Sequence, residues 1–178
     1  MNQEGKRVNE IKSEVRHNSF NPFLFFTLSI VYNVNLGQKK IMTSTVVYNG
    51  ELRTTCTHLR SENSFETDAP VDNNGKGERF SPTDLMATSL ATCMITVMSI
   101  KARTMGFDLT GVKIDVLKIM KADPRRVGGI ELTFHIPDSL LNTDEKTKTI
   151  LKNTGLTCPV ALSIHPDIDQ KVDWGSWR

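Results

Sequence analysis

The sequence of 178 residues predicts an α+β fold, and three observations carry that prediction. A central stretch, residues 85–100, contains no charged side chain and is preceded by strong helix-start residues. Segments with the apolar–polar alternation of half-buried strands lie on both sides of it. Two shorter helical segments and one more strand follow. The predicted order is β-β-β-α-β-β-α-α-β, which is typical of α+β proteins.

Composition and charge are those of an ordinary globular domain. Hydrophobic residues make up 38% of the chain, charged residues 24%, and the formal net charge is +2. Residues 1–42 carry six Lys or Arg against three Glu, so the remaining residues sum to −1. Binding to nucleic acid needs clustered positive charge. The folded part has no basic excess, which argues against a nucleic-acid partner.

The first 41 residues differ from the rest of the chain. Residues 1–19 are polar, and the apolar run over 20–34 is shorter than the roughly 20 residues that a membrane-spanning helix needs. We therefore expect residues 1–41 to be a poorly ordered or spurious N-terminal extension, and residues 42–178 to form the domain. The alternative is a membrane or export segment, although no small-residue cleavage site follows the run.

Three short strands are predicted after Met42. Alternating residues on each side of Asn49-Gly50 predict a β-hairpin that reverses at this dipeptide. The segment SFETDAP, residues 64–70, is a third strand, and the Asn- and Gly-rich residues 71–80 form a loop. That loop lacks the residue spacing of a phosphate-binding loop.

The long helix has well-defined predicted ends. Ser81 suits the N-cap, Pro82 suits the first helical position, and Asp84 completes a capping box. Gly106 supplies the C-terminal stop after Met105. Because the helix is apolar or small nearly all round, we expect it to be buried on most sides. One domain of this size has difficulty surrounding such a helix, so we expect a partner subunit.

Two longer strands follow the helix, and a last strand closes the chain. Residues 111–120 and 128–137 alternate as an antiparallel hairpin with one buried face. Residues 168–174 predict the last strand. Trp174 and Trp177 are expected to pack at an interface rather than to form a ligand site.

Two helices are predicted between the hairpin and the last strand. The first is capped by Thr143 and stopped by Gly155. The second is short and starts at Cys158-Pro159, with Cys158 at the cap and Pro159 at the first helical position.

The three cysteines, Cys56, Cys93 and Cys158, are an odd number without metal-ligand spacing. This pattern argues against a secreted disulfide scaffold and favours a reducing, cytoplasmic setting with one or two working thiols. At its helix start, Cys158 is expected to have a lowered pKa. Mid-helix, Cys93 is expected to be inert unless a cation and a second thiol approach it, and Arg79 and Cys158 could supply these. The alternative for both cysteines is plain core packing.

Two other patterns are weaker. Cys56, His58 and His135 imitate part of a zinc site, but no fourth ligand is evident, so a polar strand face explains them better. No G-x-S-x-G motif is present to anchor hydrolysis by a serine. The sequence therefore predicts no metal site.

Two segments resemble the signatures of the OsmC/Ohr family of thiol-dependent hydroperoxide reductases. PTDLMATSLATC, from Pro82 to Cys93, resembles the start of the family's central helix. CPVAL, from Cys158 to Leu162, resembles its second cysteine motif. Both occur in the expected order, and the resemblance covers about residues 42–174.

This resemblance implies an OsmC-like fold in which antiparallel sheets wrap a long central helix in an intertwined homodimer. It also implies that Cys93 attacks an organic or lipid hydroperoxide and becomes a sulfenic acid. Cys158 then forms a disulfide with it, and an external dithiol, lipoyl-type or other, restores both thiols. No bound cofactor or metal, and no membrane partner, is implied.

The sequence departs from the family's pattern at the residues that activate the thiol. The well-studied peroxidases carry Glu directly after the helix-start Pro, where this sequence has Thr83. Their activating Arg corresponds in spacing to the loop near Asn73. Arg79 is a possible substitute, since a thiolate requires a nearby cation, whereas Asp84 is explained as a cap residue. The alternatives are a non-enzymatic protein that binds an apolar ligand between the central helices, and a redox sensor or interaction protein.

Overall fold

The computed structural model describes residues 41–178, and residues 43–178 form one compact unit. The predicted extension over residues 1–41 lies, except for its last residue, outside the described residues. Over the described part, the order of helices and strands is the predicted one, with three short 3-10 turns added, η1 (Val71–Asn73), η2 (Asp138–Leu140) and η3 (Gly175–Trp177).

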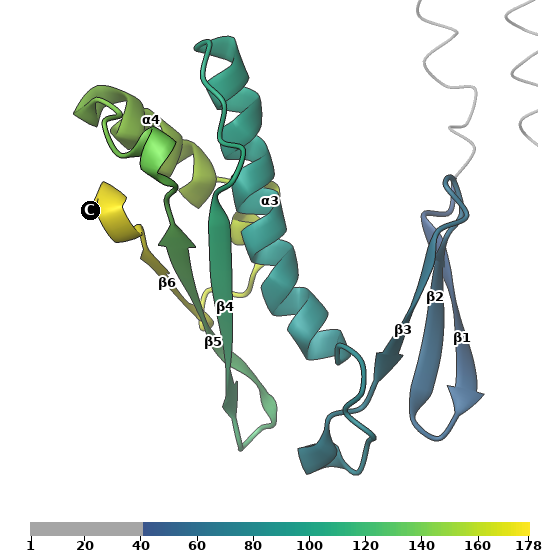
Figure 1. Ribbon diagram of the computed structural model, residues 1–178. Helices are drawn as coiled ribbons and strands as arrows, with labels where there is room; N and C mark the ends of the chain where they lie inside the picture. Colours follow the sequence, from purple (N-terminus) through teal and green to yellow (C-terminus); the bar gives the residue numbers. More distant parts are fainter. Residues whose placement is uncertain (1–40) are drawn as a thin grey trace, which may run out of the picture. The chain divides into compact units, whose positions relative to one another are not determined.

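The first sheet holds three antiparallel strands in the order β1-β2-β3 (Figure 1). They are β1 (Ser44–Gly50), β2 (Arg53–His58) and β3 (Ser64–Asp68). The three predicted short strands are thereby confirmed.

The reversal between β1 and β2 differs from the prediction. The chain turns at Glu51 and Leu52, which both adopt positive φ, of 49° and 60°. The predicted turn residues Asn49 and Gly50 still belong to β1, where the register shifts and Gly50 has φ 85°. The Asn49 side chain donates to Thr55 Oγ1 at 2.7 Å, so it joins the neighbouring strand. An Asn-Gly pair that favours positive φ here makes a bulge beside the turn.

The central helix α3 (Pro82–Thr104) begins as predicted. The Ser81 hydroxyl accepts from the Asp84 N–H at 3.1 Å, and the Asp84 carboxylate accepts from the Ser81 N–H at 2.8 Å. This reciprocal capping box satisfies two donors that the helix itself leaves free. Gly106, with φ 72°, lets the chain leave the helix after Met105.

The second sheet has the order β4-β5-β6. Strands β4 (Lys113–Lys121) and β5 (Arg126–His135) form the predicted antiparallel hairpin, and β6 (Asp169–Asp173) pairs with β5 in parallel. Exposure alternates along β4, whereas β5 is buried over most of its length.

Two helices connect β5 to β6, namely α4 (Glu145–Leu156) and α5 (Pro159–Ser163). The cap of α4 is Asp144, whose carboxylate accepts from the Thr147 N–H at 3.0 Å, so the predicted cap Thr143 is wrong by one residue. The Thr143 hydroxyl instead donates to the Leu140 carbonyl at 2.7 Å. A buried hydroxyl already bonded to the preceding turn is not free to cap α4.

Gly155 was predicted to stop α4 but lies inside it. A Cβ atom at this position would meet Met94 Cγ at 2.8 Å and Met98 Sδ at 2.9 Å. The glycine therefore marks a close approach of α4 to α3 rather than the end of a helix.

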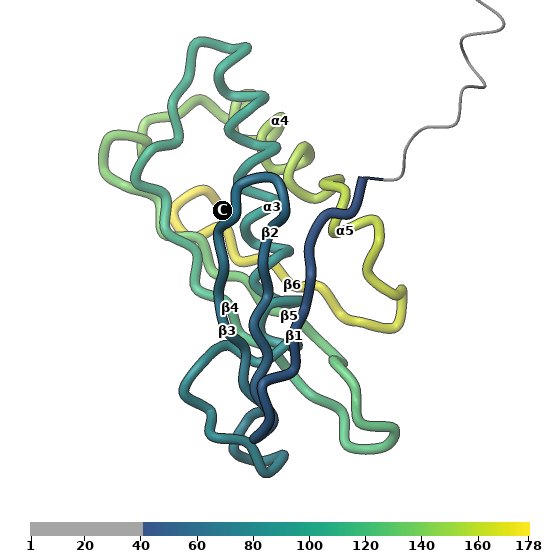
Figure 2. The backbone as a smooth tube through the Cα atoms, turned by 90° about the vertical axis from the view of Figure 1, so that its right-hand side faces the viewer, coloured from purple at the N-terminus to yellow at the C-terminus, as the bar shows by residue number. Residues whose placement is uncertain are grey.

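The hydrophobic core lies between α3, α4, α5 and the second sheet (Figures 1 and 2). Trp177 belongs to it, with no exposed surface, and donates to the Leu140 carbonyl at 3.0 Å. Trp174 packs against Phe134 with ring centroids 4.6 Å apart. The prediction that the tryptophans pack at an interface is wrong for Trp177, which is fully buried within its own chain, and it stays a prediction for Trp174, which is partly buried.

The core draws on α3 and later residues only; within the described part, no residue of the first sheet belongs to it. Several large apolar side chains stay exposed in that sheet, Val46 at 64%, Val47 at 58%, Tyr48 at 64% and Phe65 at 51%. On α3, Ile100 is 60% exposed. By length and composition alone α3 is also long enough to cross a membrane, a test that core helices pass as well.

Candidate functional site

Cys158 is held at the first turn of α5. Its backbone is extended, its Sγ accepts from the Ala161 N–H at 3.4 Å, and the sulfur is the N-cap of the helix. The residue is 1% exposed and belongs to the core. The sequence prediction of a capping cysteine before Pro159 is confirmed.

Cys93 lies mid-way along α3, partly buried against the same core. α3 contacts α5, and the Cys93 thiol lies near enough to Cys158 to raise the pKa of that buried thiol. Both sulfurs are free thiols. The fold thus brings together two cysteines that are 65 positions apart in the chain.

The pKa of Cys158 moves in the direction opposite to the predicted one. Burial raises the pKa of this thiol, and the Cys93 thiol beside it raises it further. Hydrogen bonds from the Ala161 and Val160 N–H groups act in the lowering direction but are outweighed. A helix start does favour a thiolate, but desolvation penalises the charged form more strongly here.

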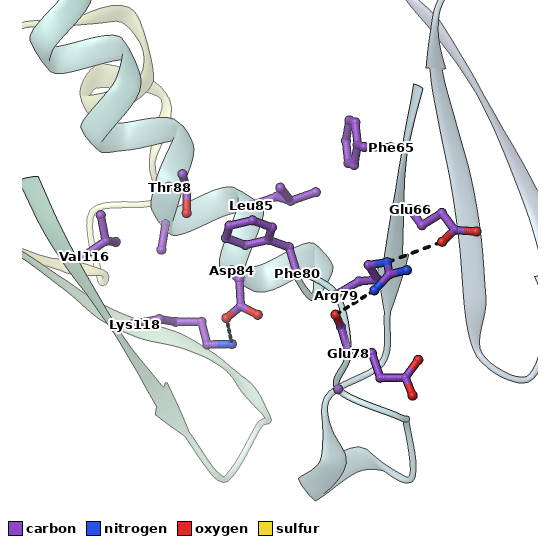
Figure 3. A pocket seen from close by; sticks show the side chains of 12 residues that line it. Phe65, Glu66, Glu78, Arg79, Phe80, Asp84, Leu85, Thr88, Val116 and Lys118 are labelled. Atoms are coloured by element: carbon purple, nitrogen blue, oxygen red, sulfur yellow. Dashed lines mark hydrogen bonds and ion pairs between the residues drawn. The ribbon is translucent and has the colours of Figure 1, made fainter. Parts of the chain in front are cut away.

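Arg79, the predicted activating cation, does not reach Cys93 within the chain. Its guanidinium lies 3.4 Å from Glu66 Oε2 and donates to the Glu78 carbonyl at 3.2 Å (Figure 3). Cys93 follows the cap Ser81 by twelve residues, which places it about 18 Å along the helix axis at 1.5 Å per residue.

Arg79 instead lines an open groove of about 1180 Å³ at the start of α3. Figure 3 shows Phe65, Phe80, Leu85 and Val116 around this groove, together with charged side chains from β3, the preceding loop and β4. The groove is therefore lined by both apolar and charged side chains, and neither candidate cysteine lines it.

Lys118, which the sequence analysis did not single out, also lines this groove. Its ammonium donates to Asp84 Oδ1 at 2.6 Å, to Thr83 Oγ1 at 3.0 Å and to Ser81 Oγ at 3.4 Å. Burial opposes ionisation of Asp84, but hydrogen bonds from Lys118 and Ser81 hold its pKa below the usual value. A sequence signal existed, since Lys118 continues the half-buried face of Ile114 and Val116.

Arg53 was also missed. Its guanidinium binds the Asp68 carboxylate through two hydrogen bonds, of 2.6 and 2.8 Å, and Glu78 Oε2 at 2.7 Å. Asp68 is only 2% exposed, and these hydrogen bonds hold its pKa below the usual value. Because Asp68 also accepts from the Glu78 N–H at 3.1 Å, this network holds the loop that carries Arg79. No local sequence pattern indicates such a pairing.

The partial zinc pattern is not assembled. His58 bonds to Ser61 at 2.7 Å, whereas His135 pairs with Asp115 at 2.7 Å in the other sheet. Cys56 lies in β2 between Val46 and Phe65 of the neighbouring strands. Over residues 41–178 there is no group of three or more potential ligands that could hold a metal ion.

A comparison with protein families finds one match. The family of OsmC-like proteins matches residues 75–173, more than half of the chain, including α3, both candidate cysteines and β4 to β6. The chain belongs to the OsmC family. The resemblance drawn from the two cysteine motifs is confirmed, and so is the predicted fold class, two sheets with a long central helix.

Solved structures of OsmC relatives agree with this assignment. A proposed osmotic stress induced and detoxification response protein from Psychrobacter arcticus is 54% identical, with a TM-score of 0.72, over 78% of this chain and 98% of that one. An organic hydroperoxide resistance protein OsmC from Legionella pneumophila is 18% identical, with a TM-score of 0.58, over 76% and 98%. None of the curated proteins matches the chain.

The organic hydroperoxide resistance protein OhrB of Bacillus subtilis shares the fold as well. It is 17% identical, with a TM-score of 0.51, and the match covers 74% of this chain and 97% of that chain. At this level of identity the likeness concerns the OsmC fold alone.

Proposed function

We propose that this OsmC family member is a thiol-dependent peroxidase that reduces organic or lipid hydroperoxides in the cytoplasm. The observation that carries the proposal is the pairing of two free thiols, one partly buried on α3 and one fully buried at the cap of α5. The names of the Legionella pneumophila and Bacillus subtilis relatives, which refer to organic hydroperoxide resistance, support it.

In the proposed reaction Cys93 is the attacking thiol. Its thiolate attacks the outer oxygen of the hydroperoxide, the O–O bond breaks, and the alkoxide leaves and takes up a proton to become the alcohol. Cys93 becomes a sulfenic acid, so the sulfur is oxidised by two electrons and the peroxide is reduced by two.

Cys158 resolves this intermediate. Its thiol condenses with the sulfenic acid, the S–S bond forms, and the hydroxyl leaves with the thiol proton as water. The raised pKa of Cys158 suits this second role, because a buried protonated thiol competes poorly as the first nucleophile. An external dithiol then returns two electrons to the disulfide, and no metal or bound organic cofactor takes part.

A homodimer would complete the site. Exposed apolar side chains on the first sheet and on α3 need a partner surface, and a second chain offers one of the same kind. Within one chain α3 separates Arg79 from Cys93. If Arg79 stabilises the thiolate, its guanidinium comes from the second chain. This assignment deepens the predicted role of Arg79 as an activating residue.

The test is peroxide consumption by single-cysteine variants. With cumene hydroperoxide and a dithiol reductant, we expect Cys93→Ser to lose at least about 100-fold in rate, since the attacking sulfur is gone. Cys158→Ser is expected to consume one equivalent and to accumulate a trappable sulfenic acid. Cys56→Ser, the matched control, keeps the parent rate. The proposal is refuted if Cys93→Ser consumes the peroxide as fast as the parent.

The second candidate function is binding of an apolar ligand without chemistry. The groove of about 1180 Å³ with its apolar lining favours it, as does the replacement of the family's glutamate by Thr83. Protein purified from its native source would then carry bound lipid, detected by mass spectrometry of an organic extract. Peroxide turnover by the purified protein would count against it.

A further inference from the structure

The helix that carries the buried thiol has little structure of its own. α5 has five residues, none of them buried, and Leu162 is 74% exposed. At its two ends, backbone hydrogen bonds of 3.1 Å run from the Leu162 N–H to the Cys158 carbonyl and from the Ile164 N–H to the Val160 carbonyl. Short elements with few buried contacts open at low free-energy cost.

The Cys158 sulfur accepts one of the hydrogen bonds that hold α5. In the reduced protein it accepts from the Ala161 N–H at 3.4 Å. In a disulfide it would lie about 2.05 Å from the Cys93 sulfur. We expect formation of the S–S bond to draw this sulfur toward α3, so that its hydrogen bond from the Ala161 N–H is lost and the first turn of α5 loses its cap.

A second bond ties the same turn to the second sheet. Gln170, on β6, donates through Nε2 to the Ala161 carbonyl at 3.2 Å. Among the side-chain hydrogen bonds of residues 41–178, it is the one that joins α5 to another element. Besides the packing of Val160 and Ala161 against the core, reduced α5 is thus held by hydrogen bonds to one sulfur and from one amide, both of which act at Ala161.

We propose that α5 is a redox-sensitive latch over the thiol pair, closed by the reduced Cys158 sulfur and loosened when this sulfur enters a disulfide with Cys93. The proposal rests on the proposed function for the disulfide and deepens it by naming how the reductant gains access. In the reduced protein Cys158 is 1% exposed, so a dithiol could not reach its sulfur.

Opening of the latch also determines the order of sulfur exchange. One thiolate of the dithiol attacks the Cys158 sulfur, the S–S bond breaks, and Cys93 leaves as a thiolate. The second thiol of the reductant then attacks its own sulfur in the mixed disulfide. Cys158 leaves as a thiolate and takes up a proton, and the reductant departs with its two sulfurs joined.

Hydrogen exchange of the full chain tests the latch directly. The disulfide is made with diamide, a thiol oxidant, so that the test does not depend on peroxide turnover. We expect the amides of residues 160–164 to exchange at least about 10-fold faster in the oxidised protein, while those of the β4–β5 hairpin stay unchanged. Cys93→Ser treated with diamide is expected to show no change. Equal exchange in the two redox states would overturn the proposal.

A variant that lacks the hydrogen bond from Gln170 to the Ala161 carbonyl gives a second readout. Gln170→Ala is expected to speed reduction of the disulfide by a dithiol several-fold, while sulfenic acid formation at Cys93 in the first turnover keeps its rate. Lys171→Ala, next on β6 but bonded to Glu131 and Asp169, is the matched control and should change neither step. Reduction of Gln170→Ala at the parent rate would also count against the latch.

The two proposals can fail separately. If diamide forms the disulfide but peroxide does not, the peroxidase proposal fails, whereas the exchange measurement on the diamide-oxidised protein still tests the latch.

Discussion

At the scale of single residues, close approach and burial govern what each side chain does. The Cys158 sulfur accepts an N–H at a helix start, an arrangement that lowers a thiol pKa, yet its pKa is raised because burial dominates. Gly155 shows the same dependence on surroundings. It lies within a helix, where glycine costs about 1 kcal/mol relative to alanine, because α3 leaves no room for a side chain.

Gly155→Val tests that close approach. The new side chain would meet Met94 and Met98 at the α3–α4 contact, and overpacking of this kind costs about 1–3 kcal/mol. We expect the free energy of unfolding, measured by urea denaturation of the reduced protein, to fall by that amount. Asn153→Ala, on the exposed side of α4, is the control and should stay within about 0.5 kcal/mol. Equal stabilities of Gly155→Val and the parent would contradict the reading of Gly155 as a packing residue.

At the scale of elements, several ends are fastened by carboxylates. Asp84 completes the capping box of α3, Asp144 is the N-cap of α4, and Asp173 fastens the chain end after β6. Asp173 accepts from Arg178 at 2.9 and 2.6 Å and from the Gly175 N–H at 3.0 Å. These bonds position η3 and with it the buried Trp177.

The hydrogen bonds of the Asp173 carboxylate predict how the stability of the fold changes at low pH. Hydrogen bonds from Arg178, and then from the Gly175 N–H, lower its pKa from 3.8 to about 2. Because the carboxyl pKa is lower in the folded than in the unfolded chain, ionised Asp173 stabilises the fold at pH values above its unfolded pKa. This contribution disappears as the pH falls from about 4 to about 2. We expect Asp173→Asn to be less stable than the parent at pH 7 and to lose less stability over that acid range. Parallel stability curves in thermal melts would contradict this assignment.

At the scale of the whole molecule, the described chain leaves apolar surface that its own core does not use. Within residues 41–178, the first sheet contributes nothing to the core and exposes large apolar side chains, and α3 exposes Ile100. A three-stranded sheet needs packing on one face to be independently stable. A second copy of the chain, wrapped around α3, would supply this packing.

Light scattering of the purified protein tests this assembly. We expect twice the chain mass for the parent at micromolar concentration. Ile100→Glu would place a charge on the apolar face of α3 and is expected to shift the protein toward single chains by at least about 10-fold in dissociation constant. Lys101→Glu, a larger change of charge on the neighbouring exposed position, is the control and should remain a dimer. A monomeric parent would rule out the homodimer.

Much of the fold was predictable because its signals are local. The capping box of Ser81 and Asp84, the alternation along β4 and the cap before Pro159 depend on residues within one or two turns. Where the prediction was wrong, a neighbour in space intervened. The Asn49 side chain donates to Thr55 of the next strand and does not form the turn, and the Thr143 hydroxyl donates to the Leu140 carbonyl. Gly155 allows the close approach of α4 to α3 and does not end α4.

The sequence by itself determined the order of helices and strands, the family and the two candidate thiols, since periodicity, caps and motifs are written in short stretches. Only the tertiary structure decided that Cys93 and Cys158 lie together, that burial raises the pKa of Cys158, and that Arg79 bonds to Glu66 and Glu78 instead of reaching Cys93 within the chain. Each of these depends on which side chains meet across the core and on how much water they lose there. The spacing of residues along the chain encodes neither these contacts nor the loss of water that accompanies them.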